Sequence, residues 1–228
     1  MPRAKTAKHR RRWTPSELIA ILDAEYGRAQ QQSSGAPVTE LVLTLLSQHT
    51  SDHNSGQAMH RLLERFPDWT DVIAASTADV EEAIRPGGLA PTKAPRLQAL
   101  LAEVYERTGF DLSALEQMPL SEAKAWLRSL PGVGPKTAAC VLLFALGRPA
   151  LPIDTHVERV ARRLGLLSRK VSVERAHELL EATLEPEQVY PFHVDLIQHG
   201  RRCCHARGPR CDECPLLERC PRLGLPKR

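Results

Sequence analysis

The sequence predicts an all-α protein, and three observations support that fold class. Leu and Ala dominate the apolar positions and aromatic residues make up only 4% of the 228 residues, a composition that favours helices over sheets. Several segments repeat apolar residues at helical spacing. No segment sustains the alternation of apolar and polar residues that is typical of a strand, and we find no internal repeat.

The N-terminal half predicts helices that are separated by short breaks. Thr14-Pro15-Ser16-Glu17 has the pattern of a capping box with proline at the first helical position, so a helix is expected through about Arg28. A polar linker follows at residues 30–35, and apolar positions resume at 38–46. Further helices are expected from about Asn54 to before Pro67, from Ser76, and from about Pro91 to Arg107, with one apolar stripe formed by Ala94, Leu97, Leu100, Leu101, Val104 and Tyr105.

The C-terminal half continues in the same way, to a total of ten or so short helices. After a predicted helix at 121–129, another begins at Pro135 and is apolar on almost all sides from 138 to 146, which is typical of a buried central helix. The remaining predicted helices follow the repeat Val157, Val160, Ala161, Leu164, which Gly165 ends, and cover residues of about 172–184 and 187–199.

Positive charge is concentrated at the two ends of the chain. Residues 1–12 contain six Lys or Arg and no acid, and residues 201–228 contain eight Lys or Arg and three acids. The segment between them, 13–200, has 17 basic and 24 acidic residues. Basic ends on an acidic body favour a polyanionic partner. Charge alone leaves open the alternative that residues 1–12 are simply a disordered, solubilising tail.

No segment approaches the ~20 apolar residues that a membrane span needs. The basic N-terminus is not followed by an apolar segment of the signal-peptide type. We therefore expect a soluble cytoplasmic protein without a membrane partner, associated with the nucleoid if the source is bacterial, and a monomer.

Four of the six cysteines form a cluster with the spacing Cys-x6-Cys-x2-Cys-x5-Cys: Cys204, Cys211, Cys214 and Cys220. In a chain without an export signal, such clustering indicates a metal centre before it indicates disulfides. Four thiolates suit an iron–sulfur cluster and zinc alike, so the chemistry alone does not choose between them. Cys203 lies outside the spacing and is interpreted as a bystander, and Cys140 as a small core residue.

Arginines are interspersed among these cysteines, and they are Arg201, Arg202, Arg207 and Arg210. A metal centre would hold them in a fixed basic face that can meet phosphates. The centre could also simply stabilise a loop that is too poor in apolar residues to fold by itself. The two roles are compatible.

Leu130-Pro131-Gly132-Val133-Gly134 lies between two predicted helices, directly before Pro135-Lys136. Two glycines let the backbone turn tightly and approach a partner closely. Their N–H groups at a helix start form an anion site that suits a DNA phosphate. An ordinary turn between helices is the alternative interpretation. Asp154, in Pro152-Ile153-Asp154-Thr155-His156, is well placed to cap the next helix, and capping alone could explain it.

Taken together, these motifs resemble the endonuclease III family, from about Leu41 to Cys220. The resemblance implies a 4Fe–4S cluster on the four spaced cysteines, a Schiff-base lysine at Lys136 and a catalytic aspartate at Asp154. It also implies DNA contacts by the hairpin residues Gly132, Val133 and Gly134, by His156 and by Arg201. Residues 45–52 resemble the loop that fills the gap left by an extruded base, with His49 as the filling residue. Gly88-Leu89 and Lys93-Ala94 resemble a second loop, whose leucine, Leu89, wedges into the opposite strand.

The sequence departs from the family pattern at two of these places. His49 stands where the family often has Gln, which puts the contacts in the base gap in doubt. Pro135 stands where Arg is common, which could remove one phosphate contact, although proline suits a first helical position.

The resemblance implies two helical domains with a DNA-binding cleft between them. Residues 30–148 would form a six-helix domain with the hairpin, and residues 13–29 with 149–228 the cluster domain, after a tail at 1–12. The implied activity is that of a bifunctional DNA glycosylase and AP lyase of base excision repair. It would act on double-stranded DNA that carries abasic sites or damaged bases, with oxidised pyrimidines as the family expectation.

A monofunctional mismatch glycosylase of the same superfamily is the first rival, but those relatives lack the lysine. A non-catalytic DNA-binding module is the second rival, and it would need neither Lys136 nor Asp154.

Overall fold

The computed structural model describes residues 12–226, and every regular element in that range is a helix. The prediction of an all-α fold is therefore confirmed for the described residues. Except for Arg12, the predicted basic tail lies outside them.

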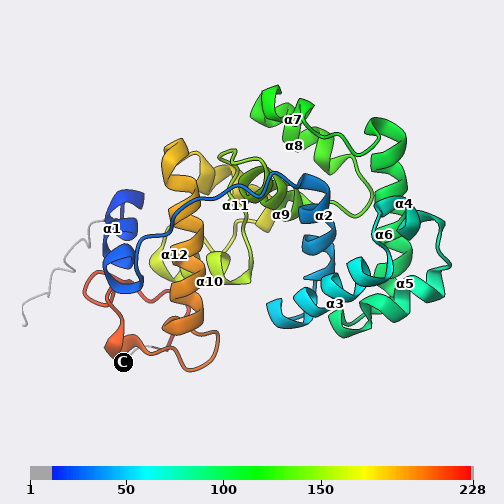
Figure 1. Ribbon diagram of the computed structural model, residues 1–228. Helices are drawn as coiled ribbons and strands as arrows, with labels where there is room; N and C mark the ends of the chain where they lie inside the picture. Colours follow the sequence, from blue (N-terminus) through cyan, green and yellow to red (C-terminus); the bar gives the residue numbers. More distant parts are fainter. Residues whose placement is uncertain (1–11, 227–228) are drawn as a thin grey trace, which may run out of the picture. The chain divides into compact units, whose positions relative to one another are not determined.

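The chain divides into two compact units (Figure 1). The first unit contains the chain up to Gln31 and the chain from Ile153 onward, and the second contains Gln32–Pro152. The helices of the first unit are α1 (Pro15–Tyr26), α10 (Thr155–Leu164), α11 (Val173–Glu181), η3 (Pro186–Gln188), α12 (Val189–Arg202) and η4 (Cys211–Glu213). Those of the second are α2 (Pro37–Leu46), α3 (Asp52–Arg65), α4 (Trp69–Ala74), α5 (Thr77–Ile84), η1 (Arg85–Gly87), α6 (Ala90–Thr108), α7 (Ala114–Gln117), α8 (Leu120–Arg128), α9 (Pro135–Cys140) and η2 (Val141–Ala145).

The second unit is built around one apolar core, to which α2, α3, α5, α6, α8 and α9 all contribute. The predicted stripe on α6 is buried at five of its six positions, since Ala94, Leu97, Leu100, Leu101 and Val104 are at most 1% exposed. The sixth residue, Tyr105, is 52% exposed and packs beside Phe110 instead. Its inclusion in the stripe was wrong, because a tyrosine at the margin of an apolar face can remain in contact with water.

The predicted central helix begins at Pro135 and is buried as expected. Its α-helical geometry ends at Cys140, and residues 141–145 form a π-helix. The wider turn is marked by the bond from the Leu146 N–H to the Val141 carbonyl, 3.2 Å long. Cys140 is 6% exposed, which confirms its interpretation as a core residue. The apolar pattern predicted burial but could not distinguish the π-turn, since both helix types bury such a segment.

In the first unit, α12 packs against both α1 and α10 (Figure 1). The predicted capping box is present, because the Thr14 hydroxyl accepts from the Glu17 N–H and the Glu17 carboxylate accepts from the Thr14 N–H. The helix ends at Tyr26, two residues earlier than predicted, where Gly27 takes a positive φ of 86°.

Two short helices were not predicted, α4 and α7, which have 6 and 4 residues. Such short elements carry too few apolar positions to show a period. Lys93 and Ala94, which the resemblance placed in a loop, lie inside α6. That helix starts at Ala90 because Leu89 takes left-handed backbone angles just before it.

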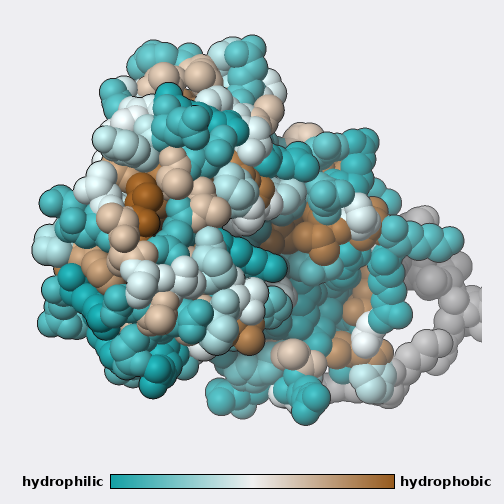
Figure 2. Space-filling model, turned by 90° about the vertical axis from the view of Figure 1, so that its right-hand side faces the viewer, coloured by the Kyte–Doolittle hydropathy of each residue, from teal (hydrophilic) through white to brown (hydrophobic). Residues whose placement is uncertain are grey.

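Most of the surface that Figure 2 shows is hydrophilic, and its apolar residues form scattered patches. Among the described residues, no helix is both long and apolar enough to span a membrane.

Candidate active site and cysteine loop

The hairpin between α8 and α9 is an exposed turn that is anchored in the core by one buried side chain. Gly132 has a φ of +75°, a left-handed angle that glycine adopts most easily. Val133 is only 7% exposed and belongs to the core, so any DNA contact by this residue is made by its backbone. Gly134 is the N-cap of α9 with extended angles, and a methyl group added to it would meet no atom within 4 Å. The turn therefore presents backbone to the solvent, as a phosphate site requires.

Lys136 lies in the first turn of α9 and is half-buried. The α9 helix packs against α2, which carries Glu40. Burial raises the pKa of the Glu40 carboxyl, while the Thr44 hydroxyl, which donates to it at 3.1 Å, and the Lys136 ammonium lower that pKa. A half-buried carboxyl group thus interacts electrostatically with the predicted nucleophile. The sequence pattern did not indicate Glu40 as a site residue, because an acid in the first turns of a helix usually faces water.

Asp154 belongs to the first unit and is the N-cap of α10. Its Oδ1 accepts a hydrogen bond from the Val157 N–H at 2.7 Å, so the capping function predicted for it is confirmed. Two residues later, the His156 Nδ1 lies 3.0 Å from Nη2 of Arg159. Burial lowers the pKa of His156. The ring also packs closely on Gly200, where an added Cβ would lie 2.9 Å from Nδ1.

The two predicted loop residues are exposed and share an unusual backbone. His49 lies in the turn between α2 and α3 with a φ of 55°, and Leu89 lies between η1 and α6 with a φ of 52°. The Leu89 side chain is 55% exposed. A large apolar side chain held out in this way is available to enter a DNA duplex.

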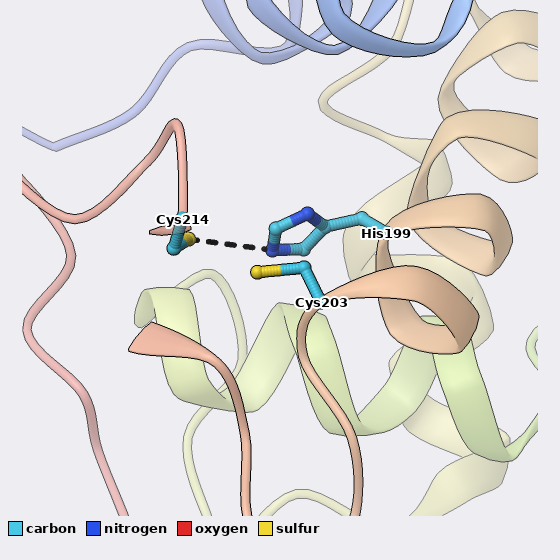
Figure 3. A group of neighbouring side chains, drawn as sticks. All are labelled: His199, Cys203 and Cys214. Atoms are coloured by element: carbon cyan, nitrogen blue, oxygen red, sulfur yellow. Dashed lines mark hydrogen bonds between the residues drawn. The ribbon is translucent and has the colours of Figure 1, made fainter. Parts of the chain in front are cut away.

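The cysteine loop surrounds a pocket in the first unit. Its lining includes all four predicted ligands, Cys204, Cys211, Cys214 and Cys220, together with Cys203 and His199. Sγ of Cys203, Sγ of Cys214 and one ring nitrogen of His199 lie within 4.8 Å of one another (Figure 3). The structure thus groups Cys203, the expected bystander, with the predicted ligands, because it is 7% exposed and faces the same pocket.

His199 links the pocket to α1. The Tyr26 hydroxyl lies 2.9 Å from His199 Nδ1, and His199 Nε2 lies 3.7 Å from Cys214 Sγ (Figure 3). Burial raises the pKa of Tyr26 and lowers that of His199 to about 4. Both groups therefore remain neutral, so the imidazole carries a single N–H, either on Nε2 facing Cys214 or on Nδ1 facing Tyr26.

Basic side chains of α10 hold the start of the loop. Arg163, 9% exposed, donates to Sγ of Cys204 at 3.2 Å and to the His205 carbonyl at 2.6 Å. Arg159 donates to the carbonyl of Cys204 at 3.0 Å. The helix that Asp154 caps is therefore also the helix that supports the cysteine loop.

The other side of the loop is held by α1. Arg219 forms two bonds to the Glu17 carboxylate, at 3.0 and 3.2 Å, and lies 4.0 Å above the Trp13 ring. The bond from Arg219 lowers the pKa of Glu17 to about 2, with the Thr14 N–H as the second cause. Arg201, by contrast, is exposed on the last turn of α12.

A family model for HhH-GPD superfamily base excision DNA repair proteins matches residues 42–186 of this chain. That range contains the exposed hairpin, Lys136 and Asp154. The all-helical fold and the hairpin thus define a base excision repair protein of the HhH-GPD superfamily.

Endonuclease III of Synechocystis sp. is 32% identical over 219 residues, which cover 95% of each chain. A relative from Arabidopsis thaliana is 35% identical over 187 residues, which are 78% of this chain but 64% of the plant protein, slightly less than two thirds of its length. A solved structure of a trapped covalent endonuclease III–DNA intermediate is similar with a TM-score of 0.77 and 31% identity, over 92% of this chain and 97% of that one. The chain therefore belongs to the endonuclease III family, as the motifs predicted, and is a DNA-binding base excision repair glycosylase and lyase.

Proposed function

We propose that this protein extrudes a damaged base from duplex DNA, excises it through Lys136, and then nicks the strand. An enzyme that acts on a base inside a duplex must first move the nucleotide out of the stack. In this proposal His49 and Leu89 occupy the space that the nucleotide leaves. Their exposure on two turns of the same unit supports these roles.

Lys136 is the proposed nucleophile. Its neutral amine attacks C1′ of the sugar, the bond from C1′ to the base breaks, and the base leaves. The resulting Schiff base makes the 2′ proton acidic, so β-elimination expels the 3′ phosphate and cuts the strand. The position of Lys136 supports this role, since it is half-buried in the first turn of α9, directly after the exposed hairpin.

Asp154 is proposed to assist the attack and to stabilise the positive charge that develops on the sugar. Lys136 and Asp154 belong to different units, so the proposal requires both units to contact the same DNA. The exposed hairpin backbone at Gly132 and Gly134, with Arg201 and His156, would contribute phosphate contacts that carry no sequence information.

We further propose that Cys204, Cys211, Cys214 and Cys220 hold a 4Fe–4S cluster. The donor set fits, because four thiols line one pocket, where Arg163 donates to Sγ of Cys204 and a ring nitrogen of His199 lies 3.7 Å from Sγ of Cys214. Burial raises the pKa of Cys214 to about 12, so a thiolate there needs a positive partner such as iron. The bound cluster would fix the loop and its arginines, and no step of the excision depends on it.

The proposed substrates are double-stranded DNAs with abasic sites or oxidised pyrimidines, and the protein would act as a monomer. Its substrate places it with the DNA of the cell, in the cytoplasm if the source is bacterial. Lys136 is the observation that opposes the first rival, a monofunctional mismatch glycosylase. The second rival, a DNA-binding module without catalysis, is opposed by family membership.

Borohydride trapping tests the assignment of Lys136. The parent protein should form a reducible covalent adduct with abasic DNA and should cut it, whereas Lys136→Gln should do neither, because an amide cannot form a Schiff base. Lys136→Gln should still bind damaged DNA. Lys170→Gln, which changes an exposed lysine of the other unit, is the matched control and should trap normally. An adduct formed by Lys136→Gln would refute the assignment.

A further inference from the structure

Lys93 is a buried charge that the excision chemistry does not use. Its side chain is 3% exposed, and Nζ donates to two backbone carbonyls, Leu46 at 2.7 Å and Gly87 at 2.8 Å. Burial lowers the pKa of this lysine. A buried ammonium group is costly unless hydrogen bonds replace its water. These two carbonyls are therefore what allows Lys93 to be buried.

Both carbonyls that accept from Lys93 lie at the C-terminal end of a helix. Leu46 is the last residue of α2, and Gly87 is the last residue of η1. Carbonyls at helix ends lack partners within their own helix and carry partial negative charge. Lys93 itself lies in the first turns of α6, the end of a helix where a cation is least favourable. It is therefore stabilised by the ends of two neighbouring elements and not by its own helix.

Each of these elements leads directly into a predicted wedge residue. The His49 turn (residues 47–51) follows Leu46, and the Leu89 turn (residues 88–89) follows Gly87. Both turns carry a non-glycine residue at positive φ, which is a strained conformation that persists only when the surroundings enforce it.

A second contact joins the same segments. A methyl group added to Gly87 would lie 3.1 Å from Cβ of Ala58 in α3, the helix that follows the His49 turn. The Leu46 carbonyl would lie 3.7 Å from that methyl group. The backbone at Gly87 is thus packed closely against both segments that flank the His49 turn, and Lys93 is bonded to the carbonyl of Gly87 as well as to that of Leu46.

We propose that Lys93 is a positioning residue, which fixes the His49 turn and the Leu89 turn relative to each other so that both side chains enter the duplex together. This inference rests on the proposed function, because it assumes that these two residues fill the opened duplex. Without the two bonds the turns would relax independently, and each would have to be ordered again when DNA binds.

The test measures opening of the duplex separately from chemistry. The probe is a duplex with a tetrahydrofuran abasic analogue, which cannot be cleaved, opposite 2-aminopurine, whose fluorescence rises when it loses its stacking partners. Saturating parent protein should raise the fluorescence. Lys93→Met, which removes the ammonium group and keeps a long apolar stem, should lose most of that rise. Leu101→Ala in the same helix is the control, since it should lower the thermal midpoint but keep the full rise while folded.

A double variant distinguishes the proposed positioning role of Lys93 from a purely structural one. The 2-aminopurine lies in the strand that Leu89 is proposed to enter, so Lys93 acts on this signal through the Leu89 turn. Adding Lys93→Met to Leu89→Ala should therefore change the fluorescence little beyond the effect of Leu89→Ala alone. Single-turnover excision from duplex DNA should slow by about 10- to 100-fold in Lys93→Met. Trapping on single-stranded abasic DNA should be unchanged, because that substrate has no second strand to open.

Three results would overturn the proposal: a full rise in folded Lys93→Met, an additive effect in the double variant, or no effect of Leu89→Ala. If Lys93→Met does not fold, Lys93→Gln replaces it, because its shorter amide keeps N–H donors but cannot span both carbonyls, and a full rise in that variant overturns the proposal equally. An error in the assignment of Lys136 would be recognised separately. Lys136→Gln would then still form the adduct, or the parent protein would fail to form it, while the fluorescence of both the parent and Lys136→Gln would still rise.

Discussion

The carboxylate of Asp154 at the start of α10 has two roles to separate: it caps the helix, and it is proposed to take part in catalysis. The cap uses Oδ1 of Asp154, which accepts from the Val157 N–H at 2.7 Å. An N-cap of this kind stabilises a helix by about 0.5–2 kcal/mol. A catalytic role would depend on the negative charge, which the cap does not need. The two roles can therefore be separated by a side chain that still accepts a hydrogen bond but is neutral.

Asp154→Asn should remain folded and bind DNA, because asparagine caps a helix as well as aspartate does. Excision of damaged bases should slow by about 10²–10³-fold, the usual size of one electrostatic contribution to a transition state. Thermal unfolding and single-turnover excision measure the two effects. Excision at the parent rate would mean that Asp154 only caps the helix.

The cysteine pocket offers five thiols for a cluster that uses four. Cys204 fits the spacing and receives a bond from Arg163 at 3.2 Å, whereas Sγ of Cys203 donates to the Arg210 carbonyl at 3.4 Å. Cys204→Ser should therefore lose iron, sulfide and the brown visible absorbance, and soluble yield should fall. Cys203→Ser should keep all of them. Equal losses in both variants would show that Cys203 is a ligand, and a colourless protein with stoichiometric zinc would defeat the iron–sulfur proposal.

At the residue scale, the burial of two charged side chains could not be predicted from the sequence. Glu40 and Lys93 each stand in the first turns of a helix, where charged side chains usually contact water. Their burial depends on neighbours that are distant in the sequence, since α2 packs on α9 and Lys93 reaches the carbonyl of Leu46, 47 residues away. Local pattern carries no information about such pairs. Asp154, by contrast, was predictable, because capping is a local property.

At the scale of elements, helix starts were predicted better than helix lengths. The capping pattern at Thr14 corresponds to an observed cap, and the helix expected from Ser76 begins at Thr77 with Ser76 as its N-cap. In both caps a hydroxyl group satisfies an N–H group only three residues away. Helix α3 starts at Asp52, two residues before its predicted start, since Ser51 is the residue that caps it. The change to a π-helix at Val141 left no signal in the apolar pattern.

The hairpin contains two glycines that should respond differently to substitution. Gly132 has a φ of +75°, so Gly132→Ala places a side chain in left-handed angles and should destabilise the protein by about 1–2 kcal/mol. Gly134 has extended angles and open space around it, so Gly134→Ala should leave the thermal midpoint unchanged.

DNA binding should nevertheless weaken in Gly134→Ala as well as in Gly132→Ala, because an added methyl group keeps a phosphate away from the backbone N–H groups. The loss should be similar for every DNA sequence, since phosphates carry no sequence information. Binding titrations with several duplexes, at one salt concentration, measure it. A loss confined to certain sequences would mean that the hairpin reads bases.

At the scale of the whole molecule, folding should depend on pH through one buried carboxyl group. Asp195 of α12 is 0% exposed, and within residues 12–226 neither of its carboxylate oxygens has a hydrogen-bond partner. Burial raises the pKa of Asp195 to about 7, and the negative charge of Asp23 in α1 adds to that increase. Because α1 packs against α12, ionisation of Asp195 would weaken the contact that also supports the cysteine loop.

The sign of the effect follows from proton binding. An aspartate in the unfolded chain has a pKa of about 3.9. Between about pH 4 and pH 7 the folded protein holds a proton that the unfolded chain has released, so the free energy of unfolding falls as the pH rises. The limit is about 1.4 kcal/mol for each unit of pH. Above pH 7 this group causes no further loss.

Asp195→Asn should therefore remove this part of the pH dependence and be more stable than the parent protein at pH 8, where the parent has to bury a charged carboxylate. Near pH 5 the advantage of Asp195→Asn should be much smaller, because the parent has by then lost only the first part of the stability that it loses between about pH 4 and pH 7. Thermal midpoints at the two pH values measure the difference, and iron content shows whether the cysteine loop is intact in each sample. If Asp195→Asn and the parent differ equally at pH 5 and pH 8, the carboxyl group does not titrate in this range.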